Sequence, residues 1–106
     1  MITKTITYSF IDCEVCITTR EVKLAGELVD VQPKVFKLIE YLIANRQKIV
    51  SKDSLQKHVW QEAFISDTAL TRAIMKARKA IGDDAQKQTC IKTVHGEGYR
   101  FIADVE

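Results

Sequence analysis

The polar side chains between Thr68 and Lys79 are spaced so that most of them fall on one face of an α-helix. At about 100° per residue, that face holds Thr68, Thr71, Arg72, Met75, Lys76 and Lys79, with Arg78 at its edge. Arginine and lysine donate hydrogen bonds to phosphates and to guanine edges, and threonine offers a methyl group or a hydroxyl. Residue types at this spacing therefore suit the major groove of a duplex nucleic acid.

The other side of the same segment predicts the helix that must hold these side chains. An apolar seam at helical spacing is formed by Leu70, Ile74, Ala77 and Ile81. Ser66 is a favoured N-cap residue, Asp67 complements the positive end of the helix dipole, and Gly82 ends the pattern. We therefore expect a helix over residues 67–81.

Downstream of this helix, a glycine-containing turn predicts a β-hairpin. Two β-prone runs, residues 90–94 and 99–102, flank Gly96-Glu97-Gly98. Glycine takes positive φ without steric cost, so a short linker that contains it is typical of a hairpin. A basic helix followed by a hairpin over residues 90–102 is the outline of a winged helix.

The upstream part of the chain predicts a sheet and two further helices. Residues 5–31 contain clusters of β-branched and aromatic side chains, which indicate an antiparallel meander of three or four strands with a turn at residues 25–27. Pro33 opens a helix that extends to Asn45, where an asparagine can adopt the left-handed conformation that ends a helix. Ser51 is the expected N-cap of a helix over residues 52–60, which completes a helix–turn–helix.

Charge is distributed unevenly along the 106 residues, although the net charge is only +2. Residues 1–32 carry three basic and five acidic side chains, residues 33–81 carry ten and four, and residues 82–106 carry three and five. A basic middle is typical of a surface that meets a polyanion, although a solvated helix face has the same pattern. No apolar run approaches the roughly 18 residues of a membrane span, so we expect a cytoplasmic chain without membrane contact.

The cysteines and histidines do not form a recognisable catalytic or metal site. A structural zinc site needs four ligands, whereas Cys13 and Cys16 have no second cysteine pair and no histidine pair at zinc-finger spacing. Strand-like alternation sends these two cysteines to opposite faces, and Cys90 makes the count odd. We therefore expect structural thiols, an exposed His58, and no metal, cofactor or catalysis. A thiol or metal enzyme built on these residues is one alternative.

Over nearly its whole length, the chain resembles a known family. The matching residues are Pro33 with Phe36, Val50-Ser51 with Leu55, the Val59-Trp60 pair, the run from Leu70 to Gly82 with its Arg78-Lys79-Ala80-Ile81-Gly82 ending, and Thr93-Val94 followed by Gly96, Gly98, Tyr99, Arg100 and Phe101. In these residues, and in its N-terminal sheet, the chain is similar to the DNA-binding effector domain of the OmpR/PhoB type. That domain occurs in two-component response regulators and in ToxR/CadC-like one-component regulators. The resemblance implies an α+β fold: a winged helix–turn–helix with an N-terminal antiparallel sheet, three helices and a C-terminal β-hairpin wing.

The resemblance also implies a function for each part of the surface. The helix over residues 67–81 would be the recognition helix, with its exposed face toward bases and phosphates and with Arg78 and Lys79 directed mainly at phosphate. The tip of the wing at His95 would reach the minor groove while Thr93 and Tyr99 touch the DNA backbone, although Tyr99 is equally suited to packing. His95 and Met75 stand where the family often has arginine, so contacts at these two positions are expected to differ.

The implied partners are double-stranded DNA and, through the loop Gln61–Ile65, RNA polymerase. Because the family tends to bind repeated sites, weak homodimerisation on DNA is also expected. A DNA-binding domain that begins near Met1 resembles the ToxR/CadC arrangement, which would place a longer regulator at the cytoplasmic face of the inner membrane; an excised C-terminal domain is the other explanation. The alternative function is a winged-helix protein-interaction module that uses the loop and Met75 as its contact patch.

Overall fold

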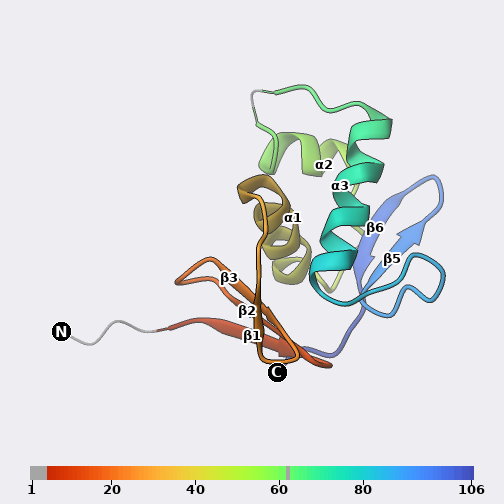
Figure 1. Cartoon of the computed structure of the whole chain (residues 1–106). Helices are drawn as coiled ribbons and strands as arrows, with labels where there is room; N and C mark the ends of the chain where they lie inside the picture. The colour runs from red at the N-terminus through yellow and green to blue at the C-terminus, as the bar shows by residue number, and fades with distance from the viewer. Residues whose placement is uncertain (1–4, 62) are drawn as a thin grey trace.

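An antiparallel sheet, three helices and a β-hairpin follow one another along the chain (Figure 1). The computed structural model describes residues 5–61 and 63–106. In this part of the chain the elements are β1 Thr7–Phe10, β2 Cys13–Cys16, β3 Glu21–Leu24, β4 Glu27–Val29, α1 Pro33–Ala44, α2 Lys52–His58, α3 Asp67–Ala80, β5 Ile91–Val94 and β6 Gly98–Phe101. This order confirms the expected α+β winged-helix architecture.

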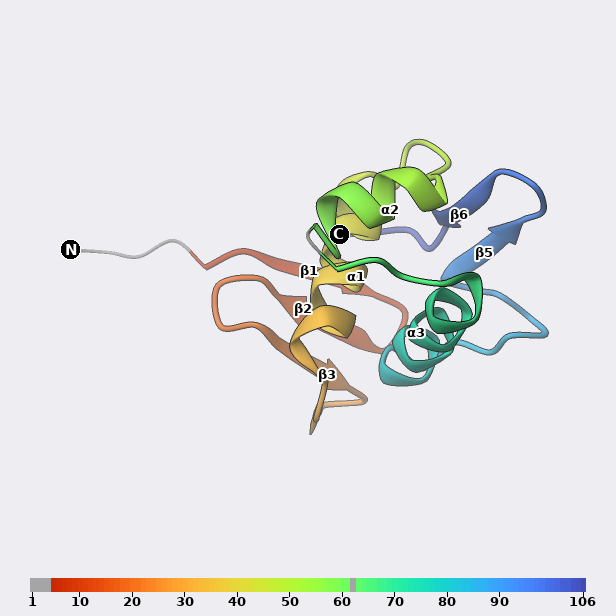
Figure 2. The ribbon, with the colours of Figure 1, turned by 90° about the horizontal axis from the view of Figure 1, so that it is seen from above.

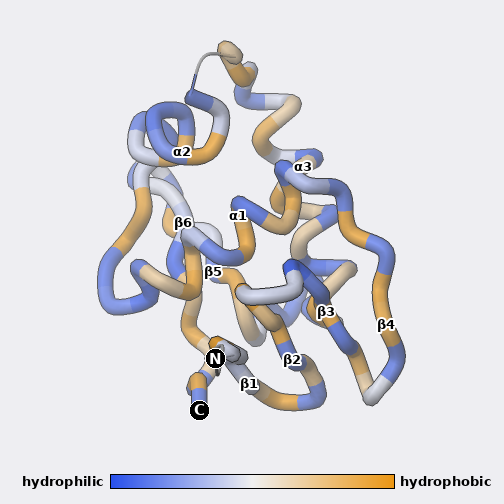
Figure 3. The backbone as a smooth tube through the Cα atoms, turned by 90° about the vertical axis from the view of Figure 1, so that its left-hand side faces the viewer, coloured by the Kyte–Doolittle hydropathy of each residue, from blue (hydrophilic) through white to orange (hydrophobic). Residues whose placement is uncertain are grey.

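The N-terminal sheet is an antiparallel meander in the order β1-β2-β3-β4. Alternate side chains point into the protein, so Val15 and Val22 pair across β2 and β3 and are both buried, and the alternation of hydropathy can be followed in Figure 3. Ala25 and Gly26 connect β3 to β4 with φ values of 52° and 81°, the signs that a two-residue type I′ turn requires. The predicted turn is therefore confirmed, and β4 begins within it, at Glu27.

α1 lies over the sheet and contacts both α3 and the wing (Figure 2). Pro33 stands at the start of the helix as expected, and Gln32 makes no side-chain cap. The prediction that Asn45 adopts the left-handed conformation is wrong, since its φ is −110°. Instead, Asn45 Nδ2 donates to Tyr41 O at 2.8 Å and Arg46 Nη1 donates to Ile43 O at 2.9 Å. Side-chain donors thus satisfy the last carbonyls of the helix without a left-handed turn.

α2 and α3 form the predicted helix–turn–helix, and each begins at a serine cap. The Ser51 hydroxyl accepts a hydrogen bond from Ser54 N, and the Ser66 hydroxyl accepts one from Ala69 N, both at 3.1 Å. α2 ends at His58, before the predicted limit, because Trp60 N reaches back to Leu55 O at 3.3 Å and so leaves the i−4 pattern.

The hydrophobic core lies where the sheet, α1, α3 and the hairpin meet. Phe10 of β1 packs edge-on against Phe101 of β6, with ring centroids 4.9 Å apart. The C-terminal segment returns beside β1, where Ser9 and Glu106 exchange two backbone hydrogen bonds of 2.9 and 3.3 Å. Among the helices of residues 5–61 and 63–106, none is long and apolar enough to cross a bilayer.

The wing, β5 with β6, joins the rest of the fold through a close backbone approach at Gly98. Val50 N donates to Tyr99 O at 2.7 Å, and Tyr99 N donates to Val50 O at 2.9 Å. Gly98 has a φ of 147°, and a Cβ there would lie 2.0 Å from Val50 O. Gly96 has a φ of 77°, and a Cβ added to it would have open space around it. Gly98 is therefore required by contact as well as by conformation, whereas Gly96 is required by conformation alone.

Gly98→Ala is expected to detach the wing, because the new methyl group overlaps the Val50 backbone. The loss in free energy of unfolding should exceed the roughly 1–2 kcal/mol that a left-handed residue costs by itself. Gly96→Ala is the matched control and should lose only about that 1–2 kcal/mol. Urea unfolding of both variants measures the difference, and equal losses would contradict the close approach at Gly98.

One carboxylate organises the connection between α3 and β5. Asp83 Oδ1 accepts hydrogen bonds from Thr89 N at 2.7 Å and from Thr89 Oγ1 at 2.9 Å. Its Oδ2 accepts from Cys90 N at 3.1 Å and from Ile91 N at 2.7 Å. Burial raises the pKa of Asp83, but the backbone and hydroxyl donors outweigh burial and hold the pKa below its ordinary value. The fold therefore favours the ionised carboxylate.

Asp83→Asn is expected to destabilise the protein at pH 7 by roughly 1–3 kcal/mol, because the donors of Thr89, Cys90 and Ile91 lose a charged acceptor. A lowered folded-state pKa means that the contribution of Asp83 is complete above the unfolded pKa and is lost as pH falls through the folded pKa. The gap between wild type and variant should therefore narrow as the pH is lowered from about 5 through the acid range. Thermal unfolding across this range measures the gap, with the exposed Asp104→Asn as control. A gap that does not change with pH would contradict this assignment.

Candidate nucleic-acid interface

One face of α3 is turned away from the core and carries the predicted recognition side chains. The exposed residues of this face are Thr68, Thr71, Arg72, Met75, Lys76 and Lys79. On the opposite side, Leu70, Ile74 and Ala77 are at most 3 % exposed. The rotation of the helix is thus set by the core, independently of any ligand.

The cationic groups of this face are not engaged within the described structure. Arg72, Lys76 and Lys79 make no side-chain hydrogen bond or ion pair with residues 5–61 or 63–106. Thr71 differs, since its hydroxyl donates to Asp67 O at 3.0 Å. Met75 exposes 56 % of its surface beside these cations. The face therefore presents exposed positive charge around one apolar side chain, which is a combination that suits phosphates together with a base edge.

An open groove separates the first turns of α3 from the wing. Its walls are Lys52 of α2, Asp67, Leu70 and Thr71 of α3, and residues 93–99 of the wing. Lys52 forms an ion pair with Asp67, which neutralises a carboxylate at the groove and joins the first turns of α2 and α3. Sequence reasoning missed Lys52; its place directly after the Ser51 cap, at the start of a helix–turn–helix, is the signal that could have found it.

The wing carries the remaining predicted contacts in two different environments. His95 is exposed at the tip beside the exposed Glu97, whereas Thr93 and Tyr99 are half-buried and pair across the hairpin. Tyr99 is also the residue that bridges to Val50. The acidic side chain of Glu97 opposes an approach of the wing tip to phosphate.

Arg78 does not lie on the exposed face, and the structure corrects the expected phosphate contact. Its side chain is only 7 % exposed. Its Nε and Nη2 donate to Ile91 O at 3.2 and 3.1 Å, and Nη2 also donates to Thr93 Oγ1 at 2.8 Å. The side chain turns inward because β5 offers it a carbonyl and a hydroxyl, and helical spacing contains no information about that strand.

Two further basic residues form a pair on the outer face of the wing. Lys92 and Arg100 stand directly opposite each other in the β5–β6 register, and both are exposed. Because side chains alternate along a strand, this pair lies on the other side of the hairpin from Thr93 and Tyr99. The period of two along residues 91–94 and 98–101 could have revealed the pair, which the sequence analysis missed.

The three cysteines are free thiols, and Cys13 and Cys90 are buried. Burial raises the pKa of Cys13 to about 12, and burial with the neighbouring Asp83 raises the pKa of Cys90. Hydrogen bonding to Thr19 and Thr7 lowers the pKa of Cys16. Within the described residues, no group of three or more histidine, cysteine or acidic side chains could hold a metal ion.

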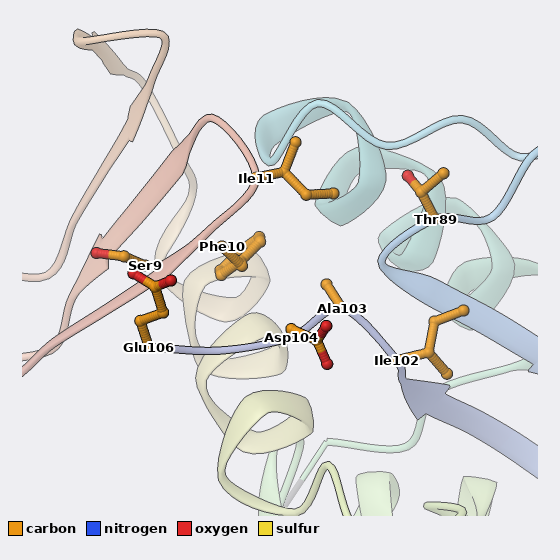
Figure 4. A pocket seen from close by; sticks show the side chains of 8 residues that line it. All are labelled: Ser9, Phe10, Ile11, Thr89, Ile102, Ala103, Asp104 and Glu106. Atoms are coloured by element: carbon orange, nitrogen blue, oxygen red, sulfur yellow. The ribbon is translucent and has the colours of Figure 1, made fainter.

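A hollow between β1 and the C-terminal segment has a different chemistry (Figure 4). Its apolar lining includes Ile11, Ile102 and Ala103, and its ionisable side chains are those of Asp104 and Glu106. Two carboxylates repel phosphate, so this hollow does not suit a nucleic acid. The candidate interface is the exposed face of α3 together with the wing.

Comparison with known proteins connects this chain to transcriptional regulation. The family model described as "Transcriptional regulatory protein, C terminal" matches residues 26–101. Transcriptional regulator HilA of Salmonella typhi is 36 % identical over 73 residues, which cover 69 % of this chain and 13 % of HilA. Transcriptional regulatory protein CrdR of Helicobacter pylori is 33 % identical over 86 residues, which cover 81 % of this chain and 35 % of CrdR. The chain therefore spans only a minor part of the length of these curated relatives.

Solved structures extend the match to the N-terminal sheet. The DNA-binding domain of Klebsiella pneumoniae RstA, solved in complex with the RstA box, is 31 % identical with a TM-score of 0.79, and the match covers 93 % of this chain and 97 % of that domain. The DNA-binding domain of Escherichia coli CadC shares the fold, with a TM-score of 0.80 at 20 % identity over 94 % of both chains. The family model and the RstA likeness together cover the sheet, the helices and the wing. The chain belongs to the OmpR/PhoB-type family of winged-helix DNA-binding domains of transcriptional regulators.

Proposed function

We propose that this domain binds duplex DNA sequence-specifically as part of a bacterial transcriptional regulator, in the cytoplasm and without catalysis. The observation that carries the proposal is the exposed cationic face of α3, which the described structure leaves unpaired while it buries the opposite face. The 31 % identical RstA domain, solved with its DNA box, supports DNA as the polyanion. Family membership and charge distribution therefore point to the same ligand.

α3 supplies the major-groove contacts in this proposal. Arg72 and Lys76 are four residues apart, one helical turn, so both can address the same short stretch of groove. Met75 lies on the same exposed face and can pack on a thymine methyl group. The proposed contact residues of the helix are Thr68, Thr71, Arg72, Met75, Lys76 and Lys79.

The wing supplies the contacts near the minor groove. The His95 imidazole at the tip can donate to acceptors on the floor of the DNA minor groove. Thr93 and Tyr99 line the groove of the protein between the wing and α3, where the DNA backbone would pass. Glu97 weakens this approach because its charge repels phosphate. We therefore infer that the wing contributes less affinity than α3.

Replacing Arg72 or Lys76 with alanine is expected to weaken specific binding by roughly 1–3 kcal/mol if each makes a base contact. The matched control is Lys23→Ala, which removes the same charge from an exposed position on the N-terminal sheet and should bind normally. Fluorescence anisotropy with a duplex selected from a random pool measures the affinities. Normal binding by both α3 variants with an intact fold would show that the recognition face is placed wrongly.

The salt dependence of the same titrations provides an independent check of the interface. Affinity should fall by about 0.9 log unit per log unit of salt for each phosphate neutralised. A Lys79→Ala variant should reduce this slope if Lys79 contacts phosphate, whereas Lys23→Ala should leave it unchanged. A flat salt dependence of the wild-type chain would count against the whole proposal.

An exposed aromatic side chain favours an additional protein partner. Phe64, between α2 and α3, is 84 % exposed. Gln56 braces the chain on both sides of it, since Nε2 donates to Ala63 O at 2.6 Å and Oε1 accepts from Ile65 N at 2.8 Å. Within the loop Gln61–Ile65, Glu62 lies outside the described residues. We propose RNA polymerase as the partner of this loop. We also propose that two copies of the domain associate weakly on adjacent DNA sites. The alternative function is a protein-interaction module that does not bind DNA.

Phe64→Ala is expected to leave DNA affinity unchanged and to weaken recruitment of RNA polymerase to the DNA-bound domain, because a braced aromatic anchor is lost. The matched control is Leu28→Ala, which truncates a 63 % exposed apolar side chain on β4. A supershift with purified polymerase holoenzyme measures recruitment. If Phe64→Ala and Leu28→Ala behave alike, the loop is not the polymerase contact.

A further inference from the structure

Two charged side chains near the C-terminal end of α3 hold the first strand of the wing. Arg78 donates through Nε and Nη2 to Ile91 O, at 3.2 and 3.1 Å, and through Nη2 to Thr93 Oγ1 at 2.8 Å. Asp83 accepts from Cys90 N at 3.1 Å and from Ile91 N at 2.7 Å. Ile91 is therefore bound at its carbonyl by one side chain and at its amide by the other.

The wing, a two-stranded sheet of β5 and β6, has a small set of other directional attachments in the described part of the chain. A β-bridge links β6 to Val50, Arg100 Nε donates to Arg46 O at 3.3 Å, and Thr93 N donates to Gln88 Oε1 at 2.9 Å. A two-stranded hairpin is marginally stable by itself, so its orientation depends on contacts at its base. Burial of Ile91 and Phe101 anchors that base but sets no direction, whereas hydrogen bonds restrict both distance and angle.

The chemistry of Arg78 suits a fixed position. A planar guanidinium can hold a carbonyl and a hydroxyl at the same time, which a lysine ammonium on a flexible stem does less well. The side chain is 7 % exposed, and a buried charge that loses its partners is strongly unfavourable. Moving β5 away from this position would therefore cost free energy twice, because the hydrogen bonds would be lost and the buried guanidinium would be left without partners.

We propose that Arg78 and Asp83 are positioning residues for DNA binding: they hold the wing at one orientation to α3, so that the major-groove and minor-groove contacts form as one unit. The inference rests on the proposed function, because it assigns α3 and the wing to neighbouring grooves. Neither side chain touches DNA in this arrangement. Their effect reaches the ligand through Ile91 and Thr93 of β5.

The test uses the 106-residue chain and the duplex that the wild type selects from a random pool. Hydroxyl-radical cleavage reports protection by the wing along the minor groove, and dimethyl sulfate reports protection of guanine N7 under α3. Arg78→Lys keeps the charge but not the planar fork, and Asp83→Asn keeps the shape but not the charge. Val22→Ala, a core truncation in the N-terminal sheet, controls for general loss of stability.

Arg78→Lys and Asp83→Asn should lose the protection assigned to the wing, keep the protection under α3, and weaken binding on the order of tenfold, an ordinary coupling between two sites. Val22→Ala should keep both protections. When Arg78→Lys is combined with His95→Ala, the two losses should not add, because a displaced wing has no His95 contact left to lose. Unchanged wing protection in both variants, or additive losses, would overturn the proposal.

If the wild-type chain does not protect the DNA minor groove from cleavage, the proposed function is contradicted, but the positioning of the wing by Arg78 and Asp83 is not. Hydrogen exchange in the chain without DNA tests this positioning. Amides of β5 and β6 should exchange at least about tenfold faster in Arg78→Lys and Asp83→Asn than in the wild type, with α1 amides unchanged. Equal exchange of the β5 and β6 amides in variants and wild type would overturn the positioning function, whatever the DNA results.

Discussion

The burial of one side of α3 is the interaction on which the rest of the structure depends. Leu70, Ile74 and Ala77 are removed from water against the core, and apolar burial contributes about 25 cal/mol per Å². This burial sets the rotation of the helix and therefore the outward direction of Arg72 and Lys76. Because the exposed side chains take no part in that packing, their charges stay unpaired within the described structure. In the proposed function, stability and DNA binding are thus carried by opposite sides of one helix.

The second constraint is the placement of the wing relative to that helix. Gly98 lets the β6 backbone approach Val50, which no larger residue would allow. Arg78 and Asp83 then bind β5 from the end of α3. An apolar core alone would leave a two-stranded hairpin poorly oriented, since hydrophobic contact has no preferred angle. Backbone proximity and directional hydrogen bonds supply the orientation that packing lacks.

Most of the fold could be predicted because its signals are local. Serine caps, an apolar seam at helical spacing, and glycines in a hairpin turn each act within a few residues, and the structure bears them out at Ser51, Ser66 and the wing. The helix α1 ends at the cap residue Asn45 as predicted, but the predicted left-handed conformation is wrong, because Asn45 and Arg46 cap the helix with their side chains. For the candidate site, helical spacing predicted the exposed face of α3 correctly. It placed Arg78 at the edge of that face, whereas the structure buries this side chain.

The sequence by itself determined the three helices, the two β regions, the family resemblance and the set of cations available on α3, because periodicity and capping are encoded between near neighbours. Only the tertiary structure decided which cations remain exposed on α3 and which cations of other elements lie near it or on the wing. Arg78 of α3 turns inward to β5, Lys52 of α2 enters the groove beside Asp67, and Lys92 of β5 stands opposite Arg100 of β6 on the outer wing. Each outcome depends on a partner 8 to 15 residues away in the sequence, and helical or strand periodicity carries no information about which partner is met.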